Sequence, residues 1–330
     1  MSTAQLVGIV MLAVPLWSAA VPMLDLTGYQ LDDGAITIKR NTPLVDPYFS
    51  TKALLIASQQ GMDVGEVTQK WINWLLVRQL PDGRFMRYCK PSPESAWIAC
   101  QDADADDAMM AMWVALLAET TRGEMSKELL DSIDRSLTQL EMLRVPATGV
   151  YCISATNQVA LLMDNVEIYE GYVALSRYFK SHGVPWREKA YAVRAMSVAA
   201  AIEKVFWMPS LKRYRVTTQA RQEDDFYPDR VAQLYPLLGG LPDIRGDRRS
   251  AYKAWLRANK KEWEMFEADY FPWGLVAIAA KSVGDRHTAA CWAATAGALR
   301  TGPRWNVLEE VVYESLQMNA IGSTTGESSC

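Results

Sequence analysis

Apolar residues recur at three- and four-residue spacing along most of the chain, which is the period of a helix that is buried on one face. In segment 64–80, Val67, Trp71, Trp74 and Leu75 follow this spacing. The pattern predicts helices in pairs joined by short turns. The predicted pairs are 49–60 with 64–80, 109–120 with 127–143, 167–180 with 186–206, 231–238 with 250–263 and 271–282 with 287–299, and a last helix covers 307–318.

The connections between the pairs are long and rich in aromatic residues. They cover residues 81–103, 146–163, 209–228 and 266–272. A ring of helical hairpins has short turns on one rim and long loops on the other, so the pattern predicts an all-α fold, the (α/α)6 toroid. The pattern predicts about eleven helices, one fewer than six hairpins require. The ring therefore has either five or six hairpins. Strand-like alternation at 149–154 with 158–162, and at 212–218, predicts small β-hairpins in the long loops of one rim.

The chain of 330 residues is 50% hydrophobic, enough for one large core, and we expect a single toroid domain over 25–318 with a polar C-terminal tail over 319–330. Residues 1–24 carry no charged side chain, and an apolar run over 6–17 is followed by small residues, as in an export signal. We therefore expect a secreted or periplasmic protein. No basic residue precedes the apolar run, so an uncleaved membrane anchor or an N-terminal core segment are the alternatives.

Charge and cysteine content narrow the function classes. The net charge is −4 and no basic stripe is present, which excludes nucleic acid as a partner. With only two histidines we expect no metal site built from histidine, and a carboxylate site for a hard cation is the alternative. We expect no cofactor. Cys89 and Cys100 flank one loop and could form a disulfide in an exported chain, whereas Cys152 and Cys291 are predicted to be buried thiols. Five cysteines, with Cys330 at the end, argue against a dense disulfide scaffold.

Five predicted helix starts combine carboxylates with nearby aromatic rings. They are Asp46-Pro-Tyr-Phe49, Asp104-Ala-Asp106-Asp107, Asp164-Asn-Val-Glu167-Ile-Tyr-Glu170, Asp224-Asp225-Phe-Tyr-Pro-Asp229 and Asp269-Tyr-Phe-Pro-Trp273. Capping explains one or two acids at a helix start, and Asp164 with Glu167 has the spacing of a capping box. Capping does not explain four aspartates within residues 102–107. We expect the five starts to converge on one acidic cleft lined by rings, where carboxylates supply acid and base and rings pack on sugars.

Several of these motifs resemble the six-hairpin glycosidases, nearest to glycoside hydrolase family 8, the bacterial endoglucanase and chitosanase group. The motifs are Asp32-Asp-Gly34, Asp46, Gln79-Leu-Pro-Asp-Gly83, and Asp102-Ala-Asp104-Ala-Asp106 leading into Ala115-Leu-Leu-Ala-Glu119. The resemblance implies that Asp46 takes the position of the general acid and that Asp104 or Asp106 binds the sugar at the cleavage point. The family has Glu followed by Gly at the acid position, whereas this chain has Asp46 followed by Pro47.

These residues define a candidate site. Asp46 or Asp106 is predicted to be the general acid, and Asp225 or Glu167 the partner that activates water or attacks the anomeric carbon. The other carboxylates predicted to bind the sugar are Asp102, Asp104, Asp107, Asp164, Asp224, Asp229 and Asp269. The rings predicted to stack on it are Tyr48, Tyr169, Tyr227 and Trp273.

The combined prediction is a glycoside hydrolase that cuts a bacterial or plant polysaccharide internally by carboxylate acid/base catalysis. Its partner is then a polysaccharide or oligosaccharide, and membrane contact occurs only through an N-terminal anchor. A non-catalytic glycan-binding toroid protein is the alternative from another class, because it would keep the rings and tolerate the loss of any single carboxylate.

A second resemblance concerns the same Asp run. Asp104-Ala-Asp106-Asp107 fits the Asp-x-Asp-Asp signature of class II terpene cyclases, which share the toroid, and Gln79-Leu-Pro-Asp-Gly83-Arg-Phe85 resembles their Gln-Trp repeat. In those enzymes the middle Asp protonates an alkene. Ala108 stands where they usually have Thr, the chain is too short for their two toroids, and the other long loops are acidic.

Overall fold

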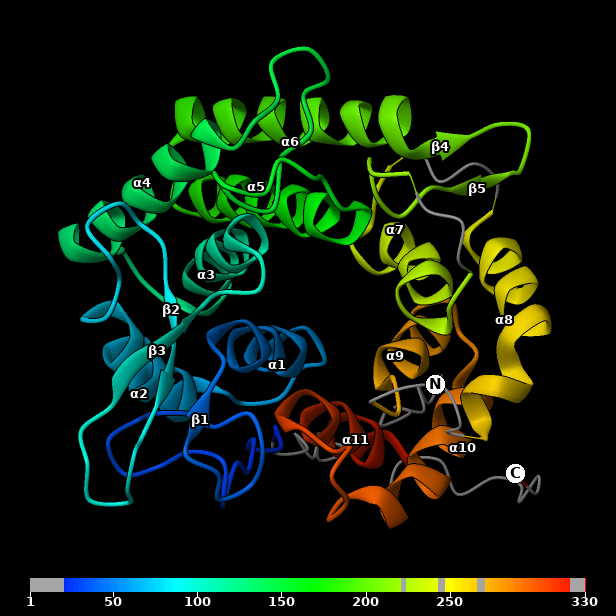
Figure 1. Cartoon of the computed structure of the whole chain (residues 1–330), viewed down its shortest axis with the longest axis horizontal. Helices are drawn as coiled ribbons and strands as arrows, with labels where there is room; N and C mark the ends of the chain where they lie inside the picture. Colours follow the sequence, from blue (N-terminus) through cyan, green and yellow to red (C-terminus); the bar gives the residue numbers. More distant parts are fainter. Residues whose placement is uncertain (1–20, 221–223, 243–246, 266–270, 321–329) are drawn as a thin grey trace, which may run out of the picture.

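A computed structural model describes residues 21–220, 224–242, 247–265, 271–320 and 330. Within these residues helices form a ring (Figure 1). The helices are α1 (Pro47–Gln59), α2 (Gly65–Leu76), α3 (Asp106–Thr120), α4 (Lys127–Met142), α5 (Leu162–Ser181), α6 (Pro185–Phe206), α7 (Tyr235–Leu238), α8 (Arg248–Glu264), α9 (Gly274–Ser282), α10 (Arg286–Ala296) and α11 (Val307–Ala320). Short helical turns η1 (Phe226–Arg230) and η2 (Val231–Leu234) precede α7, and η3 (Gly297–Leu299) follows α10.

The odd-numbered helices form the inner ring and the even-numbered helices the outer wall (Figure 1). Contacts run in order from α1 through α3, α5, α7, α9 and α11, and α11 contacts α1, which closes the ring. The predicted toroid and the pairing of its helices are therefore confirmed. Among the described residues, six inner helices face five outer ones. The segment 23–43 takes the place of a sixth outer helix, because Leu24 bonds to the backbone of Asp63 beside α2 and Ile38 accepts from Val307 of α11.

The inner helices are apolar on nearly all sides because neighbours surround them. In α3 every residue from Asp106 to Ala118 is buried. The outer helix α4 buries only Ser132, Ile133, Ser136 and Leu140 and presents a polar face to solvent. This division explains why the strict helical period is clearest in the outer helices, whereas the inner ones read as almost continuous apolar runs.

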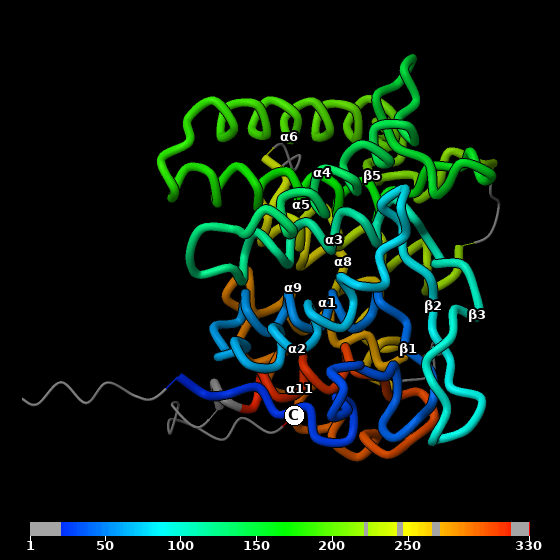
Figure 2. Tube along the Cα trace, turned by 90° about the vertical axis from the view of Figure 1, so that its left-hand side faces the viewer, coloured from blue at the N-terminus to red at the C-terminus, as the bar shows by residue number. Residues whose placement is uncertain are grey.

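The two rims of the ring differ as the loop lengths predict. Short turns join α3 to α4 and α5 to α6 on one side, and the β-strands lie on the other (Figure 2). Strands β1 (Leu44–Val45), β2 (Met86–Cys89) and β3 (Ile98–Asp102) form an antiparallel sheet in that order, and β4 (Trp207–Met208) pairs with β5 (Arg213–Tyr214). A disulfide between Cys89 and Cys100 joins β2 to β3, with 5.8 Å between the two Cα atoms.

The predicted hairpin of 149–154 with 158–162 does not form paired strands. A backbone hydrogen bond joins the two segments, from the Ile153 N–H to the Val159 carbonyl at 2.9 Å, and isolated bridges pair Arg144 with Tyr151 and Leu161 with Thr217. The reason is a side chain of α5. Asn165 accepts from the Tyr151 backbone N–H at 2.8 Å and donates to its carbonyl at 3.0 Å, so it takes the place of a partner strand.

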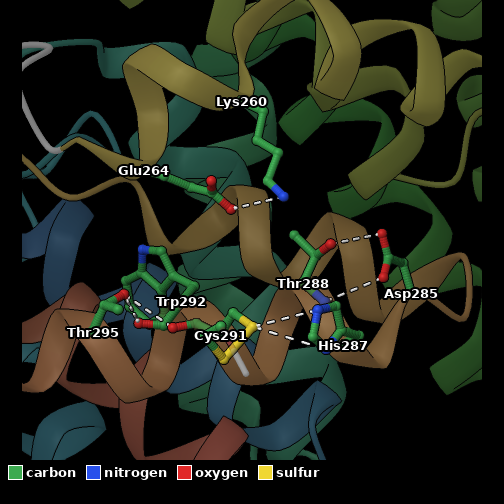
Figure 3. Close-up of a disulfide and its surroundings, with 9 residues drawn as sticks. Lys260, Glu264, Asp285, His287, Thr288, Cys291, Trp292 and Thr295 are labelled. Atoms are coloured by element: carbon green, nitrogen blue, oxygen red, sulfur yellow. Dashed lines mark hydrogen bonds and ion pairs between the residues drawn. A yellow bond between two sulfur atoms is a disulfide. The ribbon is translucent and has the colours of Figure 1, made fainter. Parts of the chain in front are cut away.

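The disulfide predicted for Cys89 and Cys100 is confirmed, whereas the prediction of buried thiols is confirmed for Cys152 and wrong for Cys291. Cys152 is a buried free thiol. Cys291 on α10 forms a disulfide with Cys330, and its sulfur lies 3.7 Å from Nε2 of His287 (Figure 3). Helix α11 extends to Ala320, two residues beyond the predicted helix end at 318, while the predicted export signal lies almost entirely outside the described residues. Among the described helices, none has the length and apolarity needed to cross a membrane.

Candidate functional site

The inner helices α1, α3 and α5 begin on the rim that carries the strands, and each brings carboxylates to the ring axis. Asp46 caps α1 by accepting from the N–H of Tyr48 at 3.1 Å. Asp106 and Asp107 open α3, and Asp164 lies in the first turn of α5. All four side chains are buried. Backbone N–H groups at a helix start favour negative charge, which lowers the cost of this burial.

A buried ion pair lies at the centre of the ring. Lys52 of α1 pairs with Glu167 of α5, and their side chains are 8% and 1% exposed. The ammonium also donates to the hydroxyls of Tyr48 at 2.8 Å and Tyr235 at 3.0 Å. Tyr48 in turn donates to Glu167 at 2.6 Å. Burial alone would lower the pKa of Lys52, but Glu167 and Tyr235 raise it above its ordinary value, so the ammonium stays charged.

Two further carboxyl groups form a pair beside this network. The side chains of Asp107 and Asp164 lie within hydrogen-bonding reach of each other. One buried oxygen of each, and Oε2 of Glu167, receive no donor from the described residues. Burial, followed by the charge of Glu167, raises the pKa of Asp164 to about 8, and burial with the charge of Asp164 raises the pKa of Asp107 well above its usual range. Both shifts favour a proton shared between these two carboxyl groups.

Asp46 and Asp106 are held by arginines of the long loop 81–103. Arg87 donates through Nε to Asp46 at 2.7 Å, so both oxygens of Asp46 are occupied. Arg84 lies 3.5 Å from Asp106. Burial nevertheless raises the pKa of both carboxyls, against the opposing effect of the arginines.

Asp104 marks the solvent side of the cluster. Its side chain is 82% exposed and lies 3.7 Å from Arg87. Its charge acts on Asp46, on Asp164 and on the Tyr227 hydroxyl, which places it near residues of three elements. Asp102, at the end of β3, is exposed and acts electrostatically on Asp106.

Three of the four predicted rings belong to this rim. Tyr48 contacts Glu167, as described above. Tyr227 stacks on Trp273 with ring centroids 4.5 Å apart. Burial, followed by the charges of Tyr235 and Asp164, raises the pKa of the Tyr227 hydroxyl. Tyr227 is 39% exposed, so this pair of rings is reachable from solvent. Tyr169 is buried on α5, and its hydroxyl lies 3.5 Å from the carbonyl of Gly240.

The aspartates around the start of η1 bind groups of their own loop and of nearby arginines. Asp224 pairs with Arg213 at 3.3 Å and with Arg230 at 3.7 Å. Asp229 accepts from the backbone N–H of Asp225 at 3.1 Å, and the Asp225 side chain is exposed. The structure therefore ties Asp224 and Asp229 into the loop and does not bring them to the buried cluster. Asp269 lies outside the described residues.

Sequence reasoning missed Lys52 and Tyr235. One signal was present, because Lys52 is the single charged residue of α1, in a helix that is otherwise apolar or uncharged. Tyr235 carried no such signal. Lys52 and Tyr235 also line a cavity of about 130 Å³ between inner helices. Glu170 lines the same cavity, and burial raises its pKa to about 8. Among the described residues, no group of three or more His, Cys, Asp or Glu side chains is placed to hold a metal ion.

The Gln79 motif has a structural role. Gln79 donates to the carbonyls of Gly83 and Ser132, both at 3.1 Å, and to the Ser136 hydroxyl at 2.9 Å. It thus fastens the end of α2 to α4.

Comparisons with solved structures identify the fold. The chain is similar to a novel alpha-amylase from Clostridium perfringens, with a TM-score of 0.59 and 11% identity over 88% of this chain and 94% of that one. An endoglucanase of glycosyl hydrolase family 8 from Klebsiella pneumoniae gives a TM-score of 0.55 and 12% identity over 89% and 96%. A GH63 mannosylglycerate hydrolase from Thermus thermophilus, in complex with glucose, gives 0.55 and 13% over 89% and 98%. The chain therefore has the (α/α)6 toroid fold that these glycosidases share. No family model and no curated protein matches the sequence.

The buried ion pair yields a test of stability. Replacing Lys52 by Met leaves Glu167 as a buried charge without its cation, and we expect the free energy of unfolding to fall by about 3–5 kcal/mol. Urea unfolding followed by circular dichroism measures the change.

A double variant separates this effect from lost packing. Lys52→Met combined with Glu167→Met should recover a large part of the loss, because no buried charge remains unpaired. If the double variant is as unstable as the sum of the two single variants, the pair is not coupled and the argument fails.

Proposed function

We propose that the protein is a glycoside hydrolase that uses buried carboxyl groups of the inner helices as acid and base. The observation that carries the proposal is the trio Asp107, Asp164 and Glu167, which share one buried site and leave one oxygen each without a donor among the residues that the structure describes. A protein that needed these groups only for capping would satisfy both oxygens, as it does in Asp46. Carboxyl groups that hold a proton near neutral pH are what glycosidic cleavage requires.

We assign the general acid to Asp164. Its pKa near 8 keeps a proton at neutral pH, and Asp107 shares that proton. Asp46, predicted from the sequence, is the weaker candidate because Arg87 and the N–H of Tyr48 occupy its oxygens. In the proposed reaction the Asp164 proton passes to the glycosidic oxygen as the bond to the anomeric carbon breaks.

Asp104 is the proposed partner carboxylate. It is exposed, and its charge acts on Asp164, so it can take a proton from a water molecule on the open side of the site while the water oxygen bonds to the anomeric carbon. Glu167 is 1% exposed and bound by Lys52 and Tyr48, which supports a positioning role through its effect on the Asp164 proton. Tyr227 stacked on Trp273 is the proposed platform for a sugar ring. We propose internal cleavage of a polysaccharide on this platform.

Export is also part of the proposal. The disulfides Cys89–Cys100 and Cys291–Cys330 support an oxidising compartment, since such bonds rarely persist in a reducing cytosol. N-terminal sequencing of the protein from periplasm or medium checks this directly. A protein found reduced in the cytosol with Met1 intact would contradict it.

Substitution of the two proposed groups tests the activity. Asp164→Asn and Asp104→Asn should each lower kcat/KM by about 10²–10⁴-fold, because general acid and base catalysis contribute on that order. Reducing-end release from β-glucans, chitosan and bacterial exopolysaccharides is the measurement. Asp131→Asn, an exposed carboxylate on the outer helix α4, is the matched control and should keep parental activity. Binding without turnover by the parent protein would instead favour the non-catalytic glycan-binding alternative.

The raised pKa of Asp164 predicts how stability depends on pH. An unfolded Asp titrates near pH 4, whereas folded Asp164 titrates at about 8. Between these values the folded state binds more protons, so the free energy of unfolding should fall as pH rises from about 4 to about 8. Asp164→Asn should flatten the decline in urea titrations at pH 5 and pH 8. If the free energy of unfolding of the variant depends on pH as steeply as that of the parent, the buried proton is refuted.

The same group predicts the pH dependence of activity. The rate of hydrolysis should fall as pH rises through about 8, because Asp164 then loses the proton that it donates.

A further inference from the structure

A groove on the outer wall of the toroid lies between α4 and α6, away from the ring axis. Its volume is about 760 Å³. Asp134, Thr138 and Glu141 line it from α4, and Trp186, Arg187 and Arg194 from α6. Residues 186–194 of α6 span about 12 Å at 1.5 Å per residue, so the groove is elongated along both helices.

An exposed aromatic ring marks one end of this groove. Trp186, in the first turn of α6, is 68% exposed, although it lies on an outer helix whose core-facing side is already packed. The guanidinium of Arg187 lies 5.1 Å from the centroid of the Trp186 ring and 4.9 Å from that of Phe179. The two aromatic contacts fix the position of Arg187 beside the exposed ring.

Two charged groups of the groove have hydrogen-bonding capacity left over. Within the described part of the chain, the side chain of Arg187 makes no ion pair or hydrogen bond, and neither does the carboxylate of Asp134. Asp134 nevertheless lies near enough to Tyr191 to raise the pKa of its hydroxyl, after burial. Glu141 differs, because Arg144 and Arg194 already bind it at 3.6 and 3.3 Å.

We propose that this groove is a second polysaccharide-binding site, separate from the acidic cluster. The exposed face of Trp186 packs against the C–H face of a pyranose, Asp134 accepts from sugar hydroxyls and Arg187 donates to them. A glycan fits these groups better than an apolar protein surface, which would bury Asp134 and Arg187 without partners. The identity of the ligand class rests on the proposed function.

Affinity electrophoresis in gels with hydroxyethyl cellulose, soluble chitosan or soluble starch tests the site. The protein carries Asp164→Asn so that the polymer is not consumed. We expect retardation in at least one gel, and Trp186→Ala should weaken the apparent affinity by about tenfold or more, as expected for loss of one large apolar contact. Trp186→Phe should keep most of the affinity because a flat ring remains, and Asp134→Asn should weaken it less than Trp186→Ala.

The controls separate this inference from the proposed hydrolysis. Val77→Ala removes an equally exposed apolar side chain outside the groove and should not change retardation. Trp186→Ala in the active protein should keep parental turnover of short soluble oligosaccharides and lose turnover of polymer. Three results would overturn the second site. They are retardation that is unchanged by Trp186→Ala, no retardation in any gel, and concentration-dependent dimerisation that Trp186→Ala abolishes. Binding that depends on Trp186 without any hydrolysis would overturn only the proposed function.

Discussion

The ion pair of Lys52 with Glu167 is the interaction on which the centre of the toroid depends. It places one ammonium where Asp107, Asp164 and Glu167 are buried together. Unscreened by water, three ionised carboxylates at such short range would repel one another strongly. The lysine compensates one of them, and the raised pKa values of Asp107 and Asp164 favour a proton shared by that pair. Because Lys52 comes from α1 and Glu167 from α5, the same contact also joins two inner helices that are not neighbours in the ring.

From solvent to ring axis, the carboxylates are stabilised in three different ways. Asp104 is exposed and solvated. Asp46 and Asp106, one layer deeper, are capped or bound by Arg87 and Arg84. The innermost groups rely on Lys52 and on protonation. Burial raises the pKa of Asp46 and Asp106 against the effect of the arginines, and burial together with neighbouring carboxylate charges raises the pKa of Asp107 and Asp164.

The architecture was predictable because it depends on local rules. Paired helical periods with short turns inside and long loops between pairs define a toroid, and acidic helix starts mark the rim where α1, α3 and α5 begin. The long loop after Gly149 was not predictable, because its backbone is satisfied by Asn165, a side chain distant in sequence. The site around Lys52 and Glu167 was only partly predictable from the sequence. Asp164 and Glu167 stood out, but their dependence on Lys52 and Tyr235 arises from contacts between α1, α5 and the start of α7 that no spacing along the chain encodes.

The closure of the ring by α11 against α1 makes assembly during synthesis an ordered process. Helix α1 is synthesised long before α11, so the surface that α11 covers stays open until α11 itself has been made. Until then the nascent ring has two exposed apolar edges, and such edges favour association with chaperones or with other unfinished chains. The apolar core of the ring is therefore complete only when α11 has packed against α1.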